Sequence, residues 1–169
     1  MIEELLREEH SRNQKDRIVT YVLKDQKNFD ALMDCFFHGK SRLCQRAAYP
    51  LLDLVLAEPT WFDPYYAKFL KKLDEPKNHP AILRNTVRIL AEIDIPKKYE
   101  MGFLDKCIEY IMDNDLPVAI RAFAITVASN ICQPHPELLA ELKMIVEDQM
   151  EYPQKPAFRF RANKVLKGK

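Results

Sequence analysis

Apolar residues recur along most of the chain at the three- and four-residue spacing of an α-helix. Such stripes cover residues 83–93, 103–111 and 138–146. A helix with a stripe of this kind must bury one side against its neighbours. No run stands out in which apolar and polar residues alternate as they do in a strand. We therefore predict an all-α fold.

Prolines divide the chain into these helices. Proline cannot continue a helix interior, and it biases the residue before it away from the helical conformation. Ten of the eleven prolines stand between apolar stripes. The exception is Pro50, which lies inside the apolar run 43–56. There it predicts a kink or a break in the helix.

The prolines that separate the helices recur periodically. Pro59, Pro96 and Pro134 are 37 and 38 residues apart, and each follows an apolar helix. Three further series keep the same period, namely the prolines that open helices, the arginines near the start of those helices, and aliphatic residues of the intervening helices: Pro80, Pro117 and Pro156; Arg46, Arg84, Arg121 and Arg161 (or Arg159); Leu32, Leu70, Ile108 and Ile145. This periodicity predicts stacked helix pairs that share one continuous core.

The predicted domain covers residues 1–169 as a single unit with an N-terminal cap and four repeats. The cap spans 1–27, and the repeats span about 28–57, 62–94, 97–132 and 135–167. The first helices are expected at about 28–38, 62–74, 98–113 and 137–150, and the second helices at about 41–57, 80–94, 117–132 and 156–167. Residues 2–25 add one or two helices, with Ser11 or Asn13 as an N-cap.

The segments PAILRNTVRIL, PVAIRAFAITV and PAFRFRANKVL align as versions of one helix. Each resembles the second helix of a HEAT-like (armadillo-type) repeat, in which a turn, an aliphatic residue, an arginine and a small or apolar position follow in order. The resemblance covers about residues 28–167. It implies a right-handed α–α superhelix, a short solenoid of about four helix pairs with N-terminal capping helices.

In HEAT-like repeats an acid or amide six residues before the arginine bonds to it and links neighbouring repeats. Asp115 precedes Arg121 at this spacing, and Asn78 precedes Arg84. The resemblance therefore implies a structural role for these arginines. The ladder would be incomplete at both ends of the array, where lysines occupy the position before the arginine: Lys40 and Lys155.

Composition and cysteine usage indicate a cytoplasmic protein with no membrane association. The 26 basic and 25 acidic side chains nearly cancel, so the net charge creates no global field that would attract nucleic acid or a membrane. No apolar run approaches the roughly 18 residues of a membrane span, and the N-terminal segment lacks a signal-peptide core. The four cysteines are scattered among apolar residues without a C-x-x-C pair, which is typical of buried free thiols.

No catalytic, cofactor-binding or metal-ligating residue is predicted. The chain has only three glycines, which argues against the glycine-rich loops that hold phosphates in many enzymes. Its four histidines are isolated, so no paired spacing for zinc ligands occurs. No serine lies in a G-x-S-x-G elbow, and nothing local supports Cys44 or Cys107 as a nucleophile. We predict a protein that is not an enzyme.

Two functional hypotheses follow from the resemblance, which implies that the second helices line a concave surface. The alternative hypothesis is nucleic-acid binding along the basic side chains of these helices, with the aromatic residues Tyr49, Phe123, Phe158 and Phe160 interleaved. Its remote extension is DNA alkylation repair, because one family of bacterial DNA glycosylases is built of HEAT-like repeats. The basic residues are Arg42, Arg46, Arg84, Arg88, Arg121, Arg159, Arg161 and Lys164.

The main hypothesis is a scaffold without catalytic activity that binds a protein partner of unknown identity. It would do so as a monomer or weak homodimer. The stripe Phe62, Tyr66 and Phe69 explains the core of the second repeat. Trp61 and Tyr65 lie beside that stripe, either as core or rim packing, which is favoured, or as partly exposed interface anchors. The candidate partner-binding residues are Arg42, Tyr49, Trp61, Arg88 and Arg159.

Overall fold

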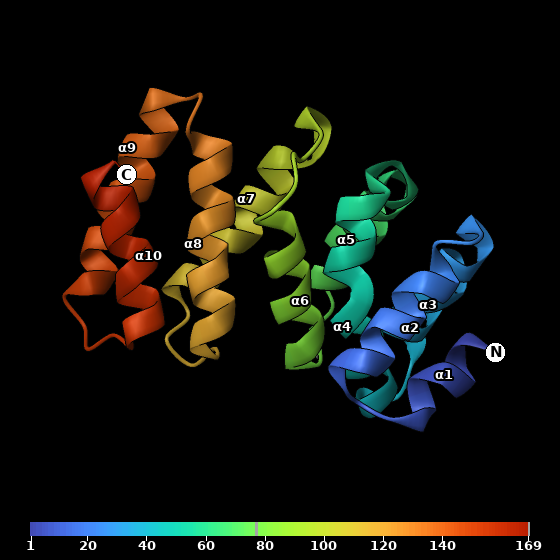
Figure 1. Cartoon of the computed structure of the whole chain (residues 1–169). Coiled ribbons are helices and arrows are strands. Elements are labelled where there is room, and N and C mark those ends of the chain that lie inside the picture. Colours follow the sequence, from blue (N-terminus) through green and yellow to red (C-terminus); the bar gives the residue numbers. More distant parts are fainter. Residues whose placement is uncertain (77, 169) are drawn as a thin grey trace.

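The structure, a computed structural model, describes residues 1–76 and 78–168, which are helical throughout except for their connections. The helices stack in one curved row from the N-terminus to the C-terminus (Figure 1). In chain order they are α1 (Ile2–Glu8), α2 (Arg12–Val22), α3 (Gln26–His38), α4 (Ser41–Ala57), the 3-10 helix η1 (Pro59–Tyr65), α5 (Tyr66–Leu73), α6 (Pro80–Leu90), α7 (Lys97–Met112), α8 (Val118–Cys132), α9 (Pro136–Met150) and α10 (Pro156–Lys167).

The helices form two layers. The second helices α2, α4, α6, α8 and α10 pack side by side in one layer, and the first helices α1, α3, α5, α7 and α9 form the other. Successive second helices pack against one another more extensively than successive first helices do. The row therefore curves around the second helices, and these lie on its inner side. An all-α helical solenoid is the observed fold, as predicted.

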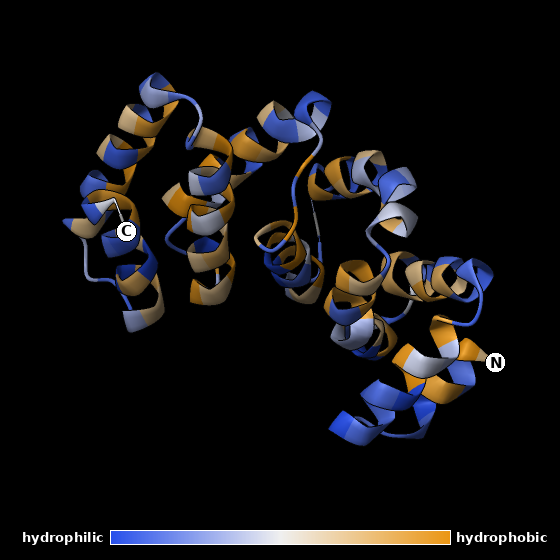
Figure 2. Ribbon diagram, turned by 45° about the horizontal axis from the view of Figure 1, so that its top comes forward, coloured by the Kyte–Doolittle hydropathy of each residue, from blue (hydrophilic) through white to orange (hydrophobic). Residues whose placement is uncertain are grey.

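One hydrophobic core runs through the whole row, from Leu6 near the N-terminus to Val165 near the C-terminus. The stripe on α7 behaves as its spacing predicts, since Phe103, Cys107 and Ile111 are buried. In Figure 2 hydrophobic and hydrophilic segments alternate along the helices, as expected for helices with one buried side. Each helix pair thus covers the apolar side of the next pair.

Local signals set where the helices begin. The Ser11 hydroxyl accepts a hydrogen bond from the backbone N–H of Gln14, which confirms Ser11 as the N-cap of α2. Asp25 caps α3 in the same way through the N–H of Lys27. Helices α6, α9 and α10 each begin with a proline, whose missing N–H costs nothing at this position.

Two predicted helices differ from the structure. The helix expected at 62–74 is η1 followed by the shorter α5, because Pro64 lies inside the segment and supplies no helical N–H. Of the kink or break expected at Pro50, the break does not occur, since α4 continues through it from Ser41 to Ala57. Pro50 is buried, and packing in the core offsets the one helical hydrogen bond that it cannot donate.

Candidate partner-binding surface

The second helices of the C-terminal part, α6, α8 and α10, present one accessible side where their buried side ends. On α8, Phe123 and Asn130 stay accessible while Ile120, Ala124 and Val127 are buried. We call the accessible side of these three helices the inner surface. It consists of Arg84, Arg88 and Ala91 on α6, of Ala119, Phe123, Thr126 and Asn130 on α8, and of Phe160, Arg161 and Lys164 on α10.

Contacts between the helices hold this surface together. The Arg161 guanidinium lies over the ring of Phe123, 4.4 Å from its centroid, and its Nη1 donates to the Thr126 hydroxyl at 2.5 Å. On the other side of α8, Asn130 Nδ2 donates to the carbonyl of Ala91 at 3.2 Å. The inner surface is therefore continuous from α6 across α8 to α10.

In this part of the protein the acidic residues of the helices lie in the first helices and not in the second helices. Helices α6, α8 and α10 contain no acidic residue. The neighbouring first helices α7 and α9 carry the acids Glu100, Asp105, Glu109, Glu137, Glu141, Glu147 and Asp148. Along the chain the acids closest to α6 on its C-terminal side are Glu92 and Asp94, which follow its end. The inner surface is thus positive although the whole chain has a formal net charge of only +1.

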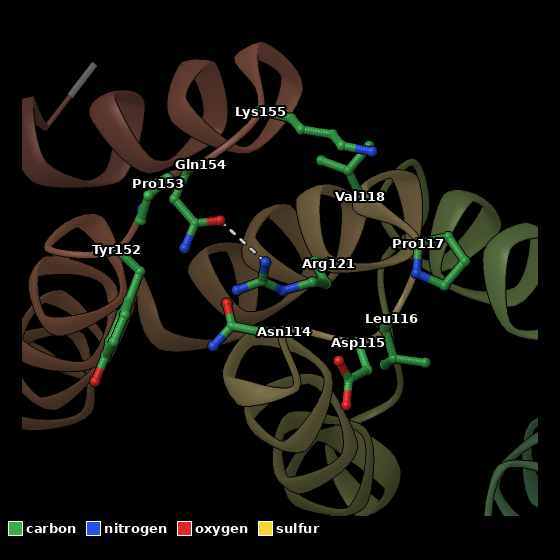
Figure 3. A pocket seen from close by; sticks show the side chains of 10 residues that line it. All are labelled: Asn114, Asp115, Leu116, Pro117, Val118, Arg121, Tyr152, Pro153, Gln154 and Lys155. Atoms are coloured by element: carbon green, nitrogen blue, oxygen red, sulfur yellow. Dashed lines mark hydrogen bonds between the residues drawn. The ribbon is translucent and has the colours of Figure 1, made fainter.

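Arg121 does not belong to the inner surface, because its side chain points into the fold. It is 5% exposed, and burial lowers the pKa of its guanidinium. Its Nε and Nη2 donate to the carbonyl of Ile111 at 3.2 and 2.8 Å, at the end of α7. Nη2 also donates to Gln149 Oε1, and Nη1 donates to Gln154 Oε1 (Figure 3). The predicted bond from Asp115 to Arg121 is therefore wrong.

These contacts explain what Arg121 does. The last carbonyls of a helix have no donor within that helix, so α7 requires one from outside. Arg121 supplies this donor, and it also donates hydrogen bonds to the side-chain amide oxygens of Gln149 and Gln154 in the next helix pair. Its guanidinium also stacks on Phe158, 4.4 Å from the ring centroid. Arg121 links neighbouring pairs, as the resemblance implies, but through residues that follow it in the chain. Beside it, the α7–α8 and α9–α10 connections line a cleft of about 590 Å³ (Figure 3).

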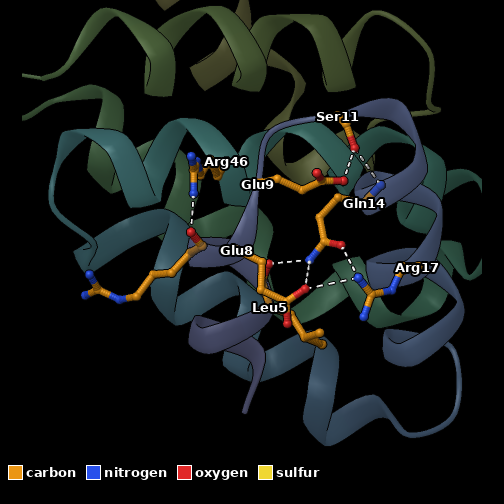
Figure 4. Close-up of polar contacts among 8 residues, drawn as sticks. Leu5, Glu8, Glu9, Ser11, Gln14, Arg17 and Arg46 are labelled. Carbon is orange, nitrogen blue, oxygen red and sulfur yellow. Dashed lines mark hydrogen bonds and ion pairs between the residues drawn. The ribbon is translucent and has the colours of Figure 1, made fainter.

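The other periodic arginines have different roles. Arg46 Nη1 donates to the carbonyls of Leu6 and Arg7 at 2.8 and 2.9 Å and so binds the end of α1 (Figure 4). Arg84 is exposed. The predicted bond between Asn78 and Arg84 is wrong, because Asn78 Oδ1, the atom that would accept it, has no hydrogen-bond partner among the described residues, while Nδ2 donates to backbone carbonyls that follow from the end of α5.

Polar side chains of the N-terminal part bind one another. Gln14 is 1% exposed and donates to the carbonyl of Leu5 at 2.6 Å and to Glu8 Oε2 at 3.2 Å (Figure 4). Arg17 Nη1 donates to Glu8 and to Gln14 Oε1. Lys15 on α2 pairs with Asp53 on α4, and this bond raises the pKa of Lys15. The contacts of Gln14 and Arg17 join α2 to α1, and the Lys15–Asp53 pair joins α2 to α4.

The structure separates the five residues predicted to bind a partner. Arg88 lies on the inner surface. Arg42 and Tyr49 share one side of α4, where Tyr49 is flanked by the His10 ring, 5.0 Å away between centroids. Trp61 is partly buried against the Phe29 ring, 5.9 Å away, so it packs in the fold. Arg159 lies beside the α9–α10 connection, away from Arg161.

Of the basic residues predicted along the second helices, Arg84, Arg161 and Lys164 share the inner surface with Arg88. The helical phase contains the signal that finds them, because the buried residues of α10 are Phe158, Ala162 and Val165. At 100° per residue, Arg161 and Lys164 lie about 70° and 130° to one side of the centre of this buried stripe. Arg159 lies about 90° to its other side, so it does not share their surface.

Ser41 and His79 lie in contact but do not form a catalytic pair. Ser41 Oγ lies 2.8 Å from Nε2 of His79. The other ring nitrogen, Nδ1, accepts a hydrogen bond from the backbone N–H of Ala81 at 3.1 Å. The neutral ring therefore carries its proton on Nε2 and donates it to Ser41, so it cannot act as a base toward that hydroxyl. His79 instead caps α6.

The thiols and carboxylates offer no reactive cluster either. Burial raises the pKa of the Cys44 thiol to about 11 and raises that of Cys107 as well, so both thiols stay protonated at neutral pH. Within residues 1–76 and 78–168, no three His, Cys, Asp or Glu side chains lie together as metal ligands would. Across the same residues, no helix combines the length and the hydropathy needed to cross a bilayer.

Comparison with known proteins gives one finding. The family described as "HEAT repeat domain" matches residues 2–169, which is nearly the whole chain. No curated protein and no solved structure matches the chain significantly.

Proposed function

Because the chain belongs to the HEAT repeat domain family, we propose that it is a scaffold without catalytic activity that holds a protein partner on its inner surface. Helical repeat arrays offer extended concave surfaces to their partners. The observation that carries the proposal is the inner surface itself, which spans three helices and exposes Arg84, Lys164 and Phe160. Exposed side chains of this kind contribute little to folding, so they are free for recognition.

All four cysteines are free thiols, three of them buried. The proposal therefore includes a reducing, cytoplasmic environment, in which free thiols persist. We further propose that the protein is a monomer or weak homodimer. The inner surface lies within one chain, so partner binding does not require a second copy.

Site-specific photocrosslinking tests the proposal. A photoreactive amino acid is placed at Arg84 or Lys164 on the inner surface, and at Glu147 on α9 as the outer control, since all three positions are exposed. We expect the two inner positions to capture the same protein from the native cytosol, and excess unlabelled wild-type protein to compete for it. Capture that is equal at Glu147, or that differs between the two inner positions, would contradict the proposal.

Nucleic-acid binding is the second candidate, because cations and the aromatic rings of Phe123 and Phe160 interleave on helices without acids. Fluorescence anisotropy of labelled single- and double-stranded oligonucleotides at about 50 and 200 mM salt tests it. Affinity that falls steeply with salt would favour it. The DNA-repair extension would also need a catalytic acid, and Asp53 on the second helix α4 is paired with Lys15, away from the inner surface.

A further inference from the structure

The cations of the inner surface form two groups. Arg84 and Arg88 lie on α6, and Arg161 and Lys164 lie on α10. Between them α8 contributes no charge to the inner surface, since Arg121 points into the fold. Packed helices lie about 8–10 Å apart, so the axes of α6 and α10, which carry the two groups, are separated by about 16–20 Å.

The strip between the groups is partly apolar. Ala119 and Phe123 lie on it next to the polar Thr126 and Asn130. Arg161 covers one side of the Phe123 ring. At the edge of the surface Phe160 is 62% exposed, with the Lys164 ammonium 4.8 Å from its centroid. A ligand that fits must combine negative charge at its ends with apolar groups in its middle.

We propose that the inner surface binds an acidic polypeptide segment of the partner, with two groups of carboxylates separated by a short apolar stretch. This inference rests on the proposed function and specifies the chemistry of the partner. An extended chain rises about 3.3 Å per residue, so five or six residues span about 16–20 Å. The carboxylates at one end then reach Arg84 and Arg88, and those at the other end reach Arg161 and Lys164.

The geometry favours a polypeptide over a nucleic acid. Phosphates are evenly spaced along a strand, whereas α8 adds no cation of its own to the inner surface, and the cation that reaches its strip, Arg161, lies at one side. Arg161 is already held by Phe123 and Thr126, which leaves further N–H groups of its planar guanidinium for a carboxylate. A guanidinium that is fixed before binding loses less conformational entropy on pairing.

Synthetic peptides test the inference with the full 169-residue chain. The probe is a fluorescein-labelled peptide with three glutamates at each end and about four or five valine, leucine and serine residues between them, so that the innermost glutamates stand about five or six positions apart. Its isomer has the same composition with the glutamates evenly distributed. Fluorescence anisotropy measures both, together with labelled oligo(dT) of about 20 nucleotides, at about 50 and 300 mM salt.

We expect the first peptide to bind at least about tenfold more tightly than its isomer, and to weaken by about tenfold at the higher salt. The double variant Arg84→Glu and Lys164→Glu should weaken binding by more than about tenfold. The matched control, Lys97→Glu and Lys143→Glu on the first helices, should leave it within about twofold. Thermal unfolding followed by circular dichroism checks that both double variants are folded.

Equal binding of the two peptides would overturn the inference, as would no binding at the lower salt. Tighter binding of oligo(dT), lost in the Arg84→Glu and Lys164→Glu variant, would overturn it in favour of a nucleic-acid groove. Crosslinking separates this failure from failure of the proposed function. A partner that crosslinks at the inner surface equally well in the Arg88→Glu variant would keep the scaffold and reject the acidic segment.

Discussion

The second helices of the N-terminal part and those of the C-terminal part differ in what their charged side chains contact. On α2 and α4, Lys15 pairs with Asp53, and Arg46 binds the carbonyls at the end of α1. On α6 and α10, Arg84 and Lys164 are exposed on helices that contain no acid. The N-terminal part therefore uses its charges to hold the capping helices, while the C-terminal part leaves most of its charges at the surface.

This difference teaches which charges folding explains. A cation that satisfies buried carbonyls contributes to stability, and an exposed one contributes almost nothing. The exposed cations of α6 and α10 are therefore the part of the pattern that folding does not account for. Arg121 is the exception within the C-terminal part, because it is buried between two helix pairs.

Arg121→Met should have the largest effect on the free energy of unfolding. It removes the donors for Ile111, Gln149 and Gln154 and leaves their buried oxygens unpaired. We expect a loss of about 3 kcal/mol, measured by urea denaturation. Arg159→Met on α10, where the arginine is exposed, should change stability by less than about 0.5 kcal/mol. Equal losses in the two variants would break the distinction between buried and surface cations.

Arg46→Met should loosen the N-terminal cap. The variant loses two charge-assisted hydrogen bonds to the end of α1, which we expect to cost about 1–2 kcal/mol. Amide hydrogen exchange should show faster exchange in α1, with α8 and α10 unchanged. The control is Arg42→Met on the same helix, where the side chain is exposed. Uniformly faster exchange in all helices would contradict a local role for Arg46.

His79→Ala should have a smaller effect at the boundary between the two parts. It removes the N-cap of α6 and the bond to Ser41, and we expect a loss of about 1 kcal/mol in urea denaturation. His135 precedes α9 but its side chain makes no capping bond, so His135→Ala should leave stability nearly unchanged. A similar loss for both variants would show that the cap is not the cause.

The smallest effect is expected for the exposed cations. Arg84→Gln combined with Lys164→Gln should change the free energy of unfolding by less than about 0.5 kcal/mol. Thermal unfolding by calorimetry measures it. A loss above about 1 kcal/mol would mean that these residues serve folding, and the comparison between the two parts would fail.

Local signals in the sequence were enough for most of the architecture. The apolar stripes and helix-opening prolines place α6 and α10 at their observed starts and α8 within one residue of its start. Ser11 acts within its own first turn, so its role as a cap could be predicted too. Pro50 shows the limit of a local rule, because α4 stays continuous through this buried proline where a kink or a break was expected.

The sequence alone determined that the chain is a helical array with a period of about 38 residues, because helix formation and proline punctuation depend on residues a few positions apart. The tertiary structure decided what each arginine of that period does. Arg46 meets a carbonyl 40 residues earlier in the chain, and Arg121 meets an amide 28 residues later. Such partners come together only when the helix pairs stack. The same packing decides which cations remain exposed on the inner surface.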